Sequence, residues 1–171
     1  MNCSNVPSIL KSEPSRTACE RLAAAKPDCE CERCSVRPKN SPGPVSAAET
    51  LARFVPPHDF DAESNCVKPS LFSHAGTNGM SVTRVEHAGE AAMRHQQQSK
   101  NYLGYVDVKC AAIQEILHDD KRSFCIYDTA LPDNAAHADV CQTVFKPASV
   151  RSELRRQLML AFSKDVKSAT S

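Results

Sequence analysis

The residues best suited to chemistry form two clusters, the first of them near the N-terminus. Cys29, Cys31 and Cys34 place three thiols close together, and thiolates are preferred zinc ligands. A structural zinc site needs four ligands, usually two close pairs on separate segments, and the sequence has no second CxxC pair. A zinc site completed by a distant cysteine or histidine is therefore one interpretation. A flexible tail that carries thiols is the favoured alternative.

The second cluster is the segment YDTALPDNAAHAD, which ends in His137 and Asp139. A histidine oriented by a carboxylate can transfer protons, so His137 and Asp139 are candidate catalytic residues. Carboxylates also suit hard cations. The alternative needs no function: Asp133 and Asn134 are typical turn residues, and His137 then makes only structural hydrogen bonds.

A third set is scattered along the chain and consists of Arg53, Lys68, Ser81 and Arg84. If the fold gathers them, guanidinium groups and a hydroxyl can bind a phosphate or carboxylate, often through two parallel hydrogen bonds. The alternative is that they are isolated surface residues, as charged side chains usually are. No nucleophile elbow, dinucleotide-binding or P-loop motif is present, so the sequence supports none of those enzyme classes.

Composition limits the partners and the compartment. The 171 residues include 21 basic and 20 acidic side chains, and the net charge of +1 does not support general nucleic-acid binding. No apolar run is long enough for a membrane span, and no signal peptide is evident, so we expect a cytoplasmic protein without membrane contact. Nine cysteines in a reducing compartment should not form a disulfide framework, and Cys110 and Cys125 should act as small apolar residues.

The elements that must position these residues lie in one central domain. Residues 1–45 are rich in proline and cysteine and poor in large apolar residues, which predicts a largely disordered tail and linker. Residues 46–163 should form a single domain, and residues 164–171 should fray. Within the domain, Ser46 and Glu49 have capping-box spacing, which favours a helical turn, although an extended conformation for Leu51 to Val55 is nearly as well supported.

The remaining domain alternates strand and helix patterns. Strong alternation or β-branched content predicts strands at residues 79–85, 102–110, 123–128 and 137–144. Helical composition or spacing predicts helices at residues 89–99 and 111–117 and after Pro147, with Ser149 as the N-cap of the last. The fold class is therefore α+β: a small mixed or antiparallel sheet of about four strands, covered by two or three helices.

Several short segments carry a resemblance. Arg53-Phe54, VKPSLF, MSVTR and PDNAAHADV resemble segments of a group of small, uncharacterised bacterial proteins, over about residues 51–163. The resemblance implies that this region is one unit and marks as motif positions Arg53, Lys68, Ser81, Arg84, His137 and Asp139. It implies no activity.

These patterns leave three functions open. The first is a binding module for a phosphorylated or carboxylate ligand, which requires only that the cations converge. The second is a small enzyme acting on a nucleotide or phosphoester with His137 as acid or base, which also requires a tuned histidine. The third is a protein–protein adaptor that uses the basic C-terminal helix and the cysteine-rich tail. The sequence does not decide whether the protein is an enzyme.

Overall fold

The computed structural model describes residue 21 and residues 39–143 and 148–169. The fold class is α+β, as predicted, with one antiparallel five-stranded sheet in the order β5-β1-β4-β9-β8. The sheet strands are β1 (Thr50–Val55), β4 (Met80–Arg84), β5 (Gly104–Lys109), β8 (Phe124–Asp128) and β9 (His137–Gln142). Two small ribbons pair β2 (Phe60–Asp61) with β3 (Cys66–Val67) and β6 (Leu117–His118) with β7 (Lys121–Arg122).

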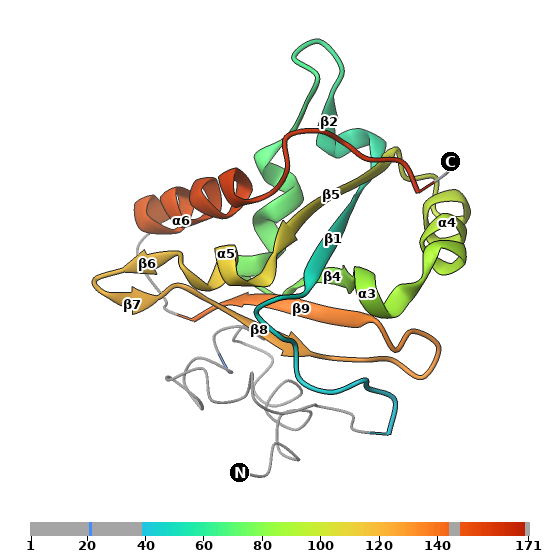
Figure 1. Ribbon diagram of the computed structural model, residues 1–171. Helices are drawn as coiled ribbons and strands as arrows, with labels where there is room; N and C mark the ends of the chain where they lie inside the picture. Colours follow the sequence, from blue (N-terminus) through green and yellow to red (C-terminus); the bar gives the residue numbers. More distant parts are fainter. Residues whose placement is uncertain (1–20, 22–38, 144–147, 170–171) are drawn as a thin grey trace.

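Helices pack on both faces of the sheet (Figure 1). On one face lie the 3-10 helix η4 (Pro69–Gly76), α5 (Cys110–Gln114) and α6 (Ala148–Ala161). The other face carries α3 (Val85–Ala88) and α4 (Glu90–Ser99). A further short 3-10 helix, η3 (Pro57–Asp59), follows β1. The α6 face holds the main apolar core, and the α4 face holds a smaller one.

The first strand resolves an alternative that the sequence left open. Residues 50–55 form β1, which pairs along its whole length with β5, so the helical turn predicted there is wrong. The capping-box hydrogen bonds still form, because the amide of Ser46 donates to Glu49 at 2.8 Å and that of Ala48 donates to the Ser46 hydroxyl at 3.3 Å. They close a turn that leads into a strand. The additional strand raises the sheet from about four strands to five.

The other predicted elements are confirmed within a few residues of their ends. In β5 the alternation is clear, since Val106 and Val108 are buried whereas Lys109 is exposed. The two aspartates at 119 and 120 adopt positive φ angles of 51° and 59° and form the tight turn between β6 and β7. Helix α6 buries Leu154 and Leu158, as its spacing predicted. Its first described residue is Ala148, so Ser149 lies inside the helix rather than at its N-cap.

The C-terminal segment pairs with the edge of the sheet within the described residues. Lys167 forms a β-bridge with Tyr105 at the edge of the sheet, with reciprocal backbone hydrogen bonds of 2.8 and 2.9 Å. Its ammonium also donates to Asp107 at 2.5 Å. Gly104 makes this close approach possible, because a Cβ there would overlap the Lys167 carbonyl and lie 2.8 Å from Val166 Cγ1. Within the described residues, Lys167 thus connects the C-terminal segment to the sheet edge.

The predicted linker also belongs partly to the domain. Val45 is buried in the main core, and Ser41 hydrogen-bonds to the carboxylate of Asp128. Of the two cysteines expected to act as small apolar residues, Cys110 is a buried thiol, whereas Cys125 is disulfide-bonded. The expectation was therefore wrong for Cys125. The domain as described begins before residue 46.

Candidate functional site

A polar pocket of ≈ 360 Å³ lies on the sheet face that carries α4. It is lined by strands β1 and β4, by α4 and the segment that follows it, and by the β8–β9 loop. The polar lining residues are Arg53, Ser81, Thr83, Gln96, Lys100, Tyr102, Asp133, Asn134 and His137. Ligand pockets usually measure about 300 to 1,000 Å³, so this one accommodates a small molecule.

The pocket opens where two strands stop pairing. Strand β1 pairs with β4 only at Leu51–Arg84 and Ala52–Thr83, whereas β4 continues its pairing with β9 as far as Met80–Val140. The guanidinium of Arg53 spans this gap and donates from Nη1 to the Ser81 carbonyl oxygen at 2.9 Å. Arg53 Nε is buried and has no hydrogen-bond partner among the described residues. The guanidinium thus retains donor capacity that the surrounding protein does not use.

The electrostatic environment of Arg53 is unusual for a lining arginine. Burial lowers the pKa of the guanidinium below its ordinary value, while Tyr102, Asp59 and Asp139 act in the opposite direction. An arginine keeps its positive charge in spite of such a shift. The buried guanidinium therefore has only part of its hydration, and nearby acidic groups balance part of its charge. An anion in the pocket would replace the lost hydration.

His137 is held by two partners that define its ring orientation. Its Nδ1 lies 2.9 Å from the Thr129 hydroxyl and 3.2 Å from the Thr129 carbonyl oxygen. The Thr129 hydroxyl donates to Asp139 at 2.7 Å, so it accepts from His137 Nδ1, which therefore carries a proton. Nε2 of the neutral ring is then a hydrogen-bond acceptor, and after protonation it becomes a donor for an anion. Asp139 also accepts from Ser81 at 3.1 Å.

The remaining walls come from α4 and the residues after it. Tyr102 stacks on Phe54, with ring centroids 5.4 Å apart, which fixes one wall of the pocket. Gln96 accepts a hydrogen bond from Thr83 at 3.4 Å, and that contact leaves its amide nitrogen available. Lys100 lies one turn after Gln96 and is exposed. The pocket therefore combines several donors with one lining carboxylate, Asp133.

Arg84, which the sequence nominates as a ligand-binding residue, does not line the polar pocket. It is 1% exposed, and it makes a double hydrogen bond to Glu49 at 2.6 and 2.8 Å. Nη1 donates to the Gly43 carbonyl oxygen at 2.7 Å and lies 3.6 Å from Asp128, while Nη2 donates to the Pro44 carbonyl oxygen at 3.3 Å. We refer to Arg84, Glu49 and Asp128 as the Arg84 cluster. It joins the linker to the sheet.

Lys68 is also outside the pocket. It is exposed at the start of η4, and its ammonium donates to the His58 carbonyl oxygen at 3.1 Å. Of the residues that sequence reasoning nominated, the fold brings together Arg53, Ser81, His137 and Asp139, the last behind the pocket wall. Cys29, Cys31 and Cys34 lie outside the described residues, so the zinc interpretation stays a prediction.

Three lining residues were missed at the sequence level: Gln96, Lys100 and Tyr102. Gln96 lies in the last turn of the predicted helix and Lys100 directly follows that helix, four residues later, which favours the same side of the helix end. That spacing was a usable signal. The position of Tyr102 against Phe54 depends on the pairing of β1 with β5, which no local pattern reveals.

Residues 39–143 and 148–169 contain no group of three or more His, Cys, Asp or Glu side chains placed to hold a metal ion. In those ranges no helix has the length and apolar character that crossing a bilayer requires. Comparison with protein-family models, with curated proteins and with solved structures gave no match. The resemblance to small bacterial proteins remains a prediction.

Proposed function

We propose that the domain is a binding module for a small carboxylate ligand held in the polar pocket. The observation that carries the proposal is the state of Arg53, a partly buried cation whose Nε has no hydrogen-bond partner among the described residues. Guanidinium groups bind carboxylates through two parallel hydrogen bonds, and in the described part of the chain only one Nη of Arg53 has a hydrogen-bond partner. Lys100 adds a further donor.

A carboxylate fits this pocket better than a phosphate dianion does. Asp133 lines the pocket, and Asp59 and Asp139 both act on Arg53. Like charges in a partly buried site repel each other, so every additional ligand charge is less favourable. Asp133 and Asn134 can instead accept hydrogen bonds, which favours a ligand with a hydroxyl or ammonium group beside its carboxylate. Small hydroxy acids and amino acids have this combination.

The test is a thermal-shift screen of the full chain against small carboxylates, hydroxy acids and amino acids. A ligand that prefers the native state raises the melting temperature. We expect a hit whose effect disappears in Arg53→Gln and in His137→Asn, since Asn retains an amide near Nδ1 but lacks Nε2. Lys68→Gln is the matched control, because the sequence also predicted Lys68 as a ligand-binding residue but its side chain lies outside the pocket.

The screen also has a clear negative result. If no member shifts the melting temperature, or if Lys68→Gln abolishes the shift as fully as Arg53→Gln does, the pocket is not the carboxylate site. In that case the adaptor hypothesis becomes the leading one.

Catalysis is a second candidate, favoured by one specific observation. The Asp139–Thr129–His137 chain of hydrogen bonds leaves the Nε2 lone pair of neutral His137 available as a general base. For an ester ligand in the pocket, Nε2 would accept a proton from the attacking water and then donate it to the leaving oxygen. Hydrolysis or proton exchange of a bound hit, lost in His137→Asn with binding retained, would establish this activity; binding without turnover would exclude it for that ligand.

A further inference from the structure

The chain after α6 wraps around the edge of the sheet from one face to the other. We refer to residues 162–169 as the C-terminal strap (Figure 1). Phe162 and Val166 pack against the main core on the α6 face, whereas Ala169 packs against the small core on the α4 face. Between these contacts the strap passes the outer edge of β5 and forms the bridge with Tyr105. The strap therefore connects the larger core to the smaller one.

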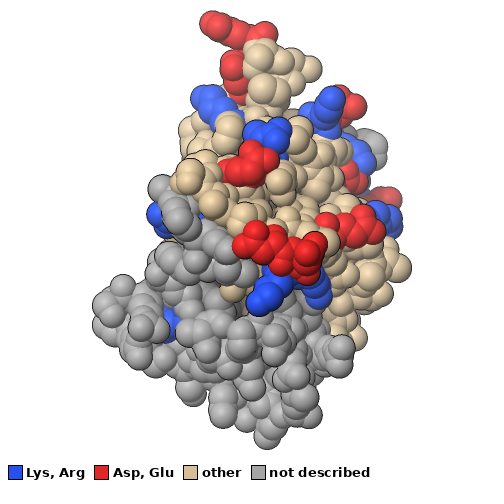
Figure 2. Space-filling view, turned by 90° about the vertical axis from the view of Figure 1, so that its left-hand side faces the viewer, with Lys and Arg blue, Asp and Glu red and all other residues tan. Residues whose placement is uncertain are grey.

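Hydrogen bonds to β5 fix the position of the strap. The amide of Ser163 donates to the Asp107 carbonyl oxygen at 2.7 Å, and the Ser163 hydroxyl accepts from the Asp107 amide at 3.0 Å. Lys167 adds its bridge with Tyr105. Figure 2 shows charges of both signs on the side of the molecule that carries α6, from which the strap starts. Pairing with β5, rather than attraction to one sign of charge, therefore holds the strap.

Helix α4 is attached to the sheet by few apolar contacts. Of its ten residues, all of them described, it buries Met93 and Gln97. The small core beneath it consists of Ala52, Phe54 and Met93, and five partly buried side chains surround them, Ala169 of the strap among them. Elements with few buried apolar contacts open locally at a lower free energy than core strands do. The strap thus supplies one of the few contacts that keep this wall of the polar pocket in place.

Gln97 connects the strap to the polar pocket. Gln97 is 9% exposed, its Oε1 accepts from the Ala169 amide at 2.8 Å, and its Nε2 donates to the Leu103 carbonyl oxygen at 3.3 Å. Its backbone carbonyl oxygen accepts from the Tyr102 amide at 2.9 Å. Tyr102 lines the pocket, and so does Gln96, the residue before Gln97. One residue thus joins the strap to the helix and the turn that form one pocket wall.

We propose that the strap is a latch for the polar pocket. While the Ala169 amide is bonded to Gln97, α4 and Tyr102 stay in the binding position, and when the strap is released that wall opens together with it. A ligand then stabilises the latched state, and the strap with it, although none of the strap residues, all of them described, lines the pocket. The effect on ligands rests on the carboxylate pocket proposed above. The joint opening of the strap and α4 does not.

The first experiment is hydrogen exchange of the full-length, nitrogen-15-labelled chain without ligand, followed by NMR. Gln97→Met removes both side-chain hydrogen bonds from the α4 side, and Ala169→Pro removes the amide hydrogen from the strap side. One hydrogen bond changes an opening equilibrium by about three- to tenfold, so the Met93 amide in α4 should exchange faster by that factor in both variants. Gln98→Met is the matched control, because Gln98 is the next residue and is exposed. It should leave the exchange unchanged.

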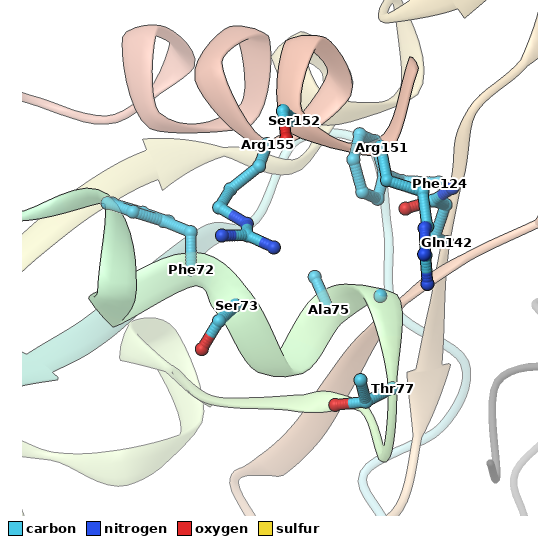
Figure 3. A pocket seen from close by; sticks show the side chains of 10 residues that line it. Phe72, Ser73, Ala75, Thr77, Phe124, Gln142, Arg151, Ser152 and Arg155 are labelled. Carbon is cyan, nitrogen blue, oxygen red and sulfur yellow. The ribbon is translucent and has the colours of Figure 1, made fainter. Parts of the chain in front are cut away.

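Arg155→Gln is a second control, on the opposite face of the sheet. Figure 3 shows Arg155 projecting from α6 toward η4, into a cavity whose described lining residues all differ from those of the polar pocket. This variant alters the helix from which the strap starts but none of the contacts between the strap and α4. Exchange at Met93 should therefore stay within about twofold of the wild type.

The second experiment repeats the exchange with malate, a small hydroxy acid, at about ten times its dissociation constant. A ligand that binds only the latched state should slow exchange at the Met93 and Ala169 amides about tenfold in the wild type. In Gln97→Met the slowing at Ala169 should be lost. Protection of Met93 without protection of Ala169 in the wild type would contradict the link between the strap and the ligand.

Circular dichroism monitors folding, and Ala169→Pro, near the end of the chain, decides the question if Gln97→Met does not fold. Unchanged exchange at Met93 in the folded Ala169→Pro variant overturns the proposal, and so does an equal acceleration in Gln98→Met. If malate does not bind the wild type, the carboxylate proposal loses this ligand, while the exchange without ligand still decides whether the strap is a latch.

Discussion

Arg53 and Arg84 lie on neighbouring strands, and sequence reasoning assigned them the same role, yet their surroundings are opposite. The Arg84 guanidinium is fully buried and is matched by Glu49, by two backbone carbonyl oxygens and by Asp128 nearby. Arg53 is only partly buried, uses one Nη for the Ser81 carbonyl and has an Nε with no partner among the described residues. A satisfied cation stabilises the fold, whereas an under-satisfied one beside a cavity is available to a ligand.

The largest expected effect tests the structural half of this comparison. Arg84→Met leaves the carboxylates of Glu49 and Asp128 buried without their cation, which should lower the free energy of unfolding by about 3 to 5 kcal/mol. Urea denaturation measures the change. Arg84→Lys serves as the control that keeps the charge and should cost less. A loss below about 1 kcal/mol in the Met variant would contradict the structural role.

The next effect disturbs the contact between the C-terminal segment and the edge of the sheet while leaving the Arg84 cluster intact. Gly104→Ala places a methyl group against the backbone of Lys167, so it should destabilise the protein by about 1 to 3 kcal/mol and release the C-terminal segment. Hydrogen exchange should become faster at the paired amides of Tyr105 and Lys167. At Gly76, the control, an added Cβ meets only the Gln142 side chain, at 3.3 Å. Unchanged exchange in Gly104→Ala would show that the segment is not anchored there.

The pH dependence of the free energy of unfolding tests the contribution of Glu49, one member of the Arg84 cluster. Burial alone would raise the pKa of Glu49, but hydrogen bonds from Arg84 and Ser46, together with the nearby charges, bring it below the ordinary value of 4.5. Its stabilising contribution is therefore complete above pH 4.5 and is lost as the pH falls through the lower folded-state pKa. Urea titrations at a series of acidic pH values should show a smaller loss in Glu49→Gln than in the wild type. Equal slopes would exclude this assignment.

The smallest effect on stability is expected at Arg53. Arg53→Gln removes one hydrogen bond to the Ser81 carbonyl and a partly desolvated charge, so the free energy of unfolding should change by about 1 kcal/mol or less. Urea denaturation alongside Arg84→Met provides the direct contrast. If the two variants lose equal stability, Arg53 is a structural residue like Arg84, and the comparison fails.

Local patterns predicted most elements of this fold but not their partners. The alternation of Met80 and Val82 correctly predicted β4, and the spacing of Leu154 and Leu158 correctly predicted α6. The same alternation places Arg84 on the buried face of β4, a signal that it needed buried carboxylates. Those carboxylates lie far away in sequence, at positions 49 and 128, and no local rule connects them.

The candidate site was predictable only in part for the same reason. Ser81 and Asp139 are opposite each other in the pairing of β4 with β9, and Thr83 is opposite His137, so the nominated residues converge through strand register. Register depends on contacts across the whole sheet rather than on spacing along the chain. The role of Thr129 between His137 and Asp139 could not be inferred before the strands were paired.

The most direct test of the contrast between the two arginines is an NMR titration of the full-length, nitrogen-15-labelled chain with malate, a small hydroxy acid. The resonance of Arg53 Nε–Hε and the imidazole nitrogens of His137 should shift and saturate together, while Arg84 Nε–Hε stays unchanged. The shifts should be absent in Arg53→Gln. If Arg53 and His137 do not respond to malate, or if Arg84 responds as strongly as Arg53, the assignment of Arg53 to binding and Arg84 to structure is wrong.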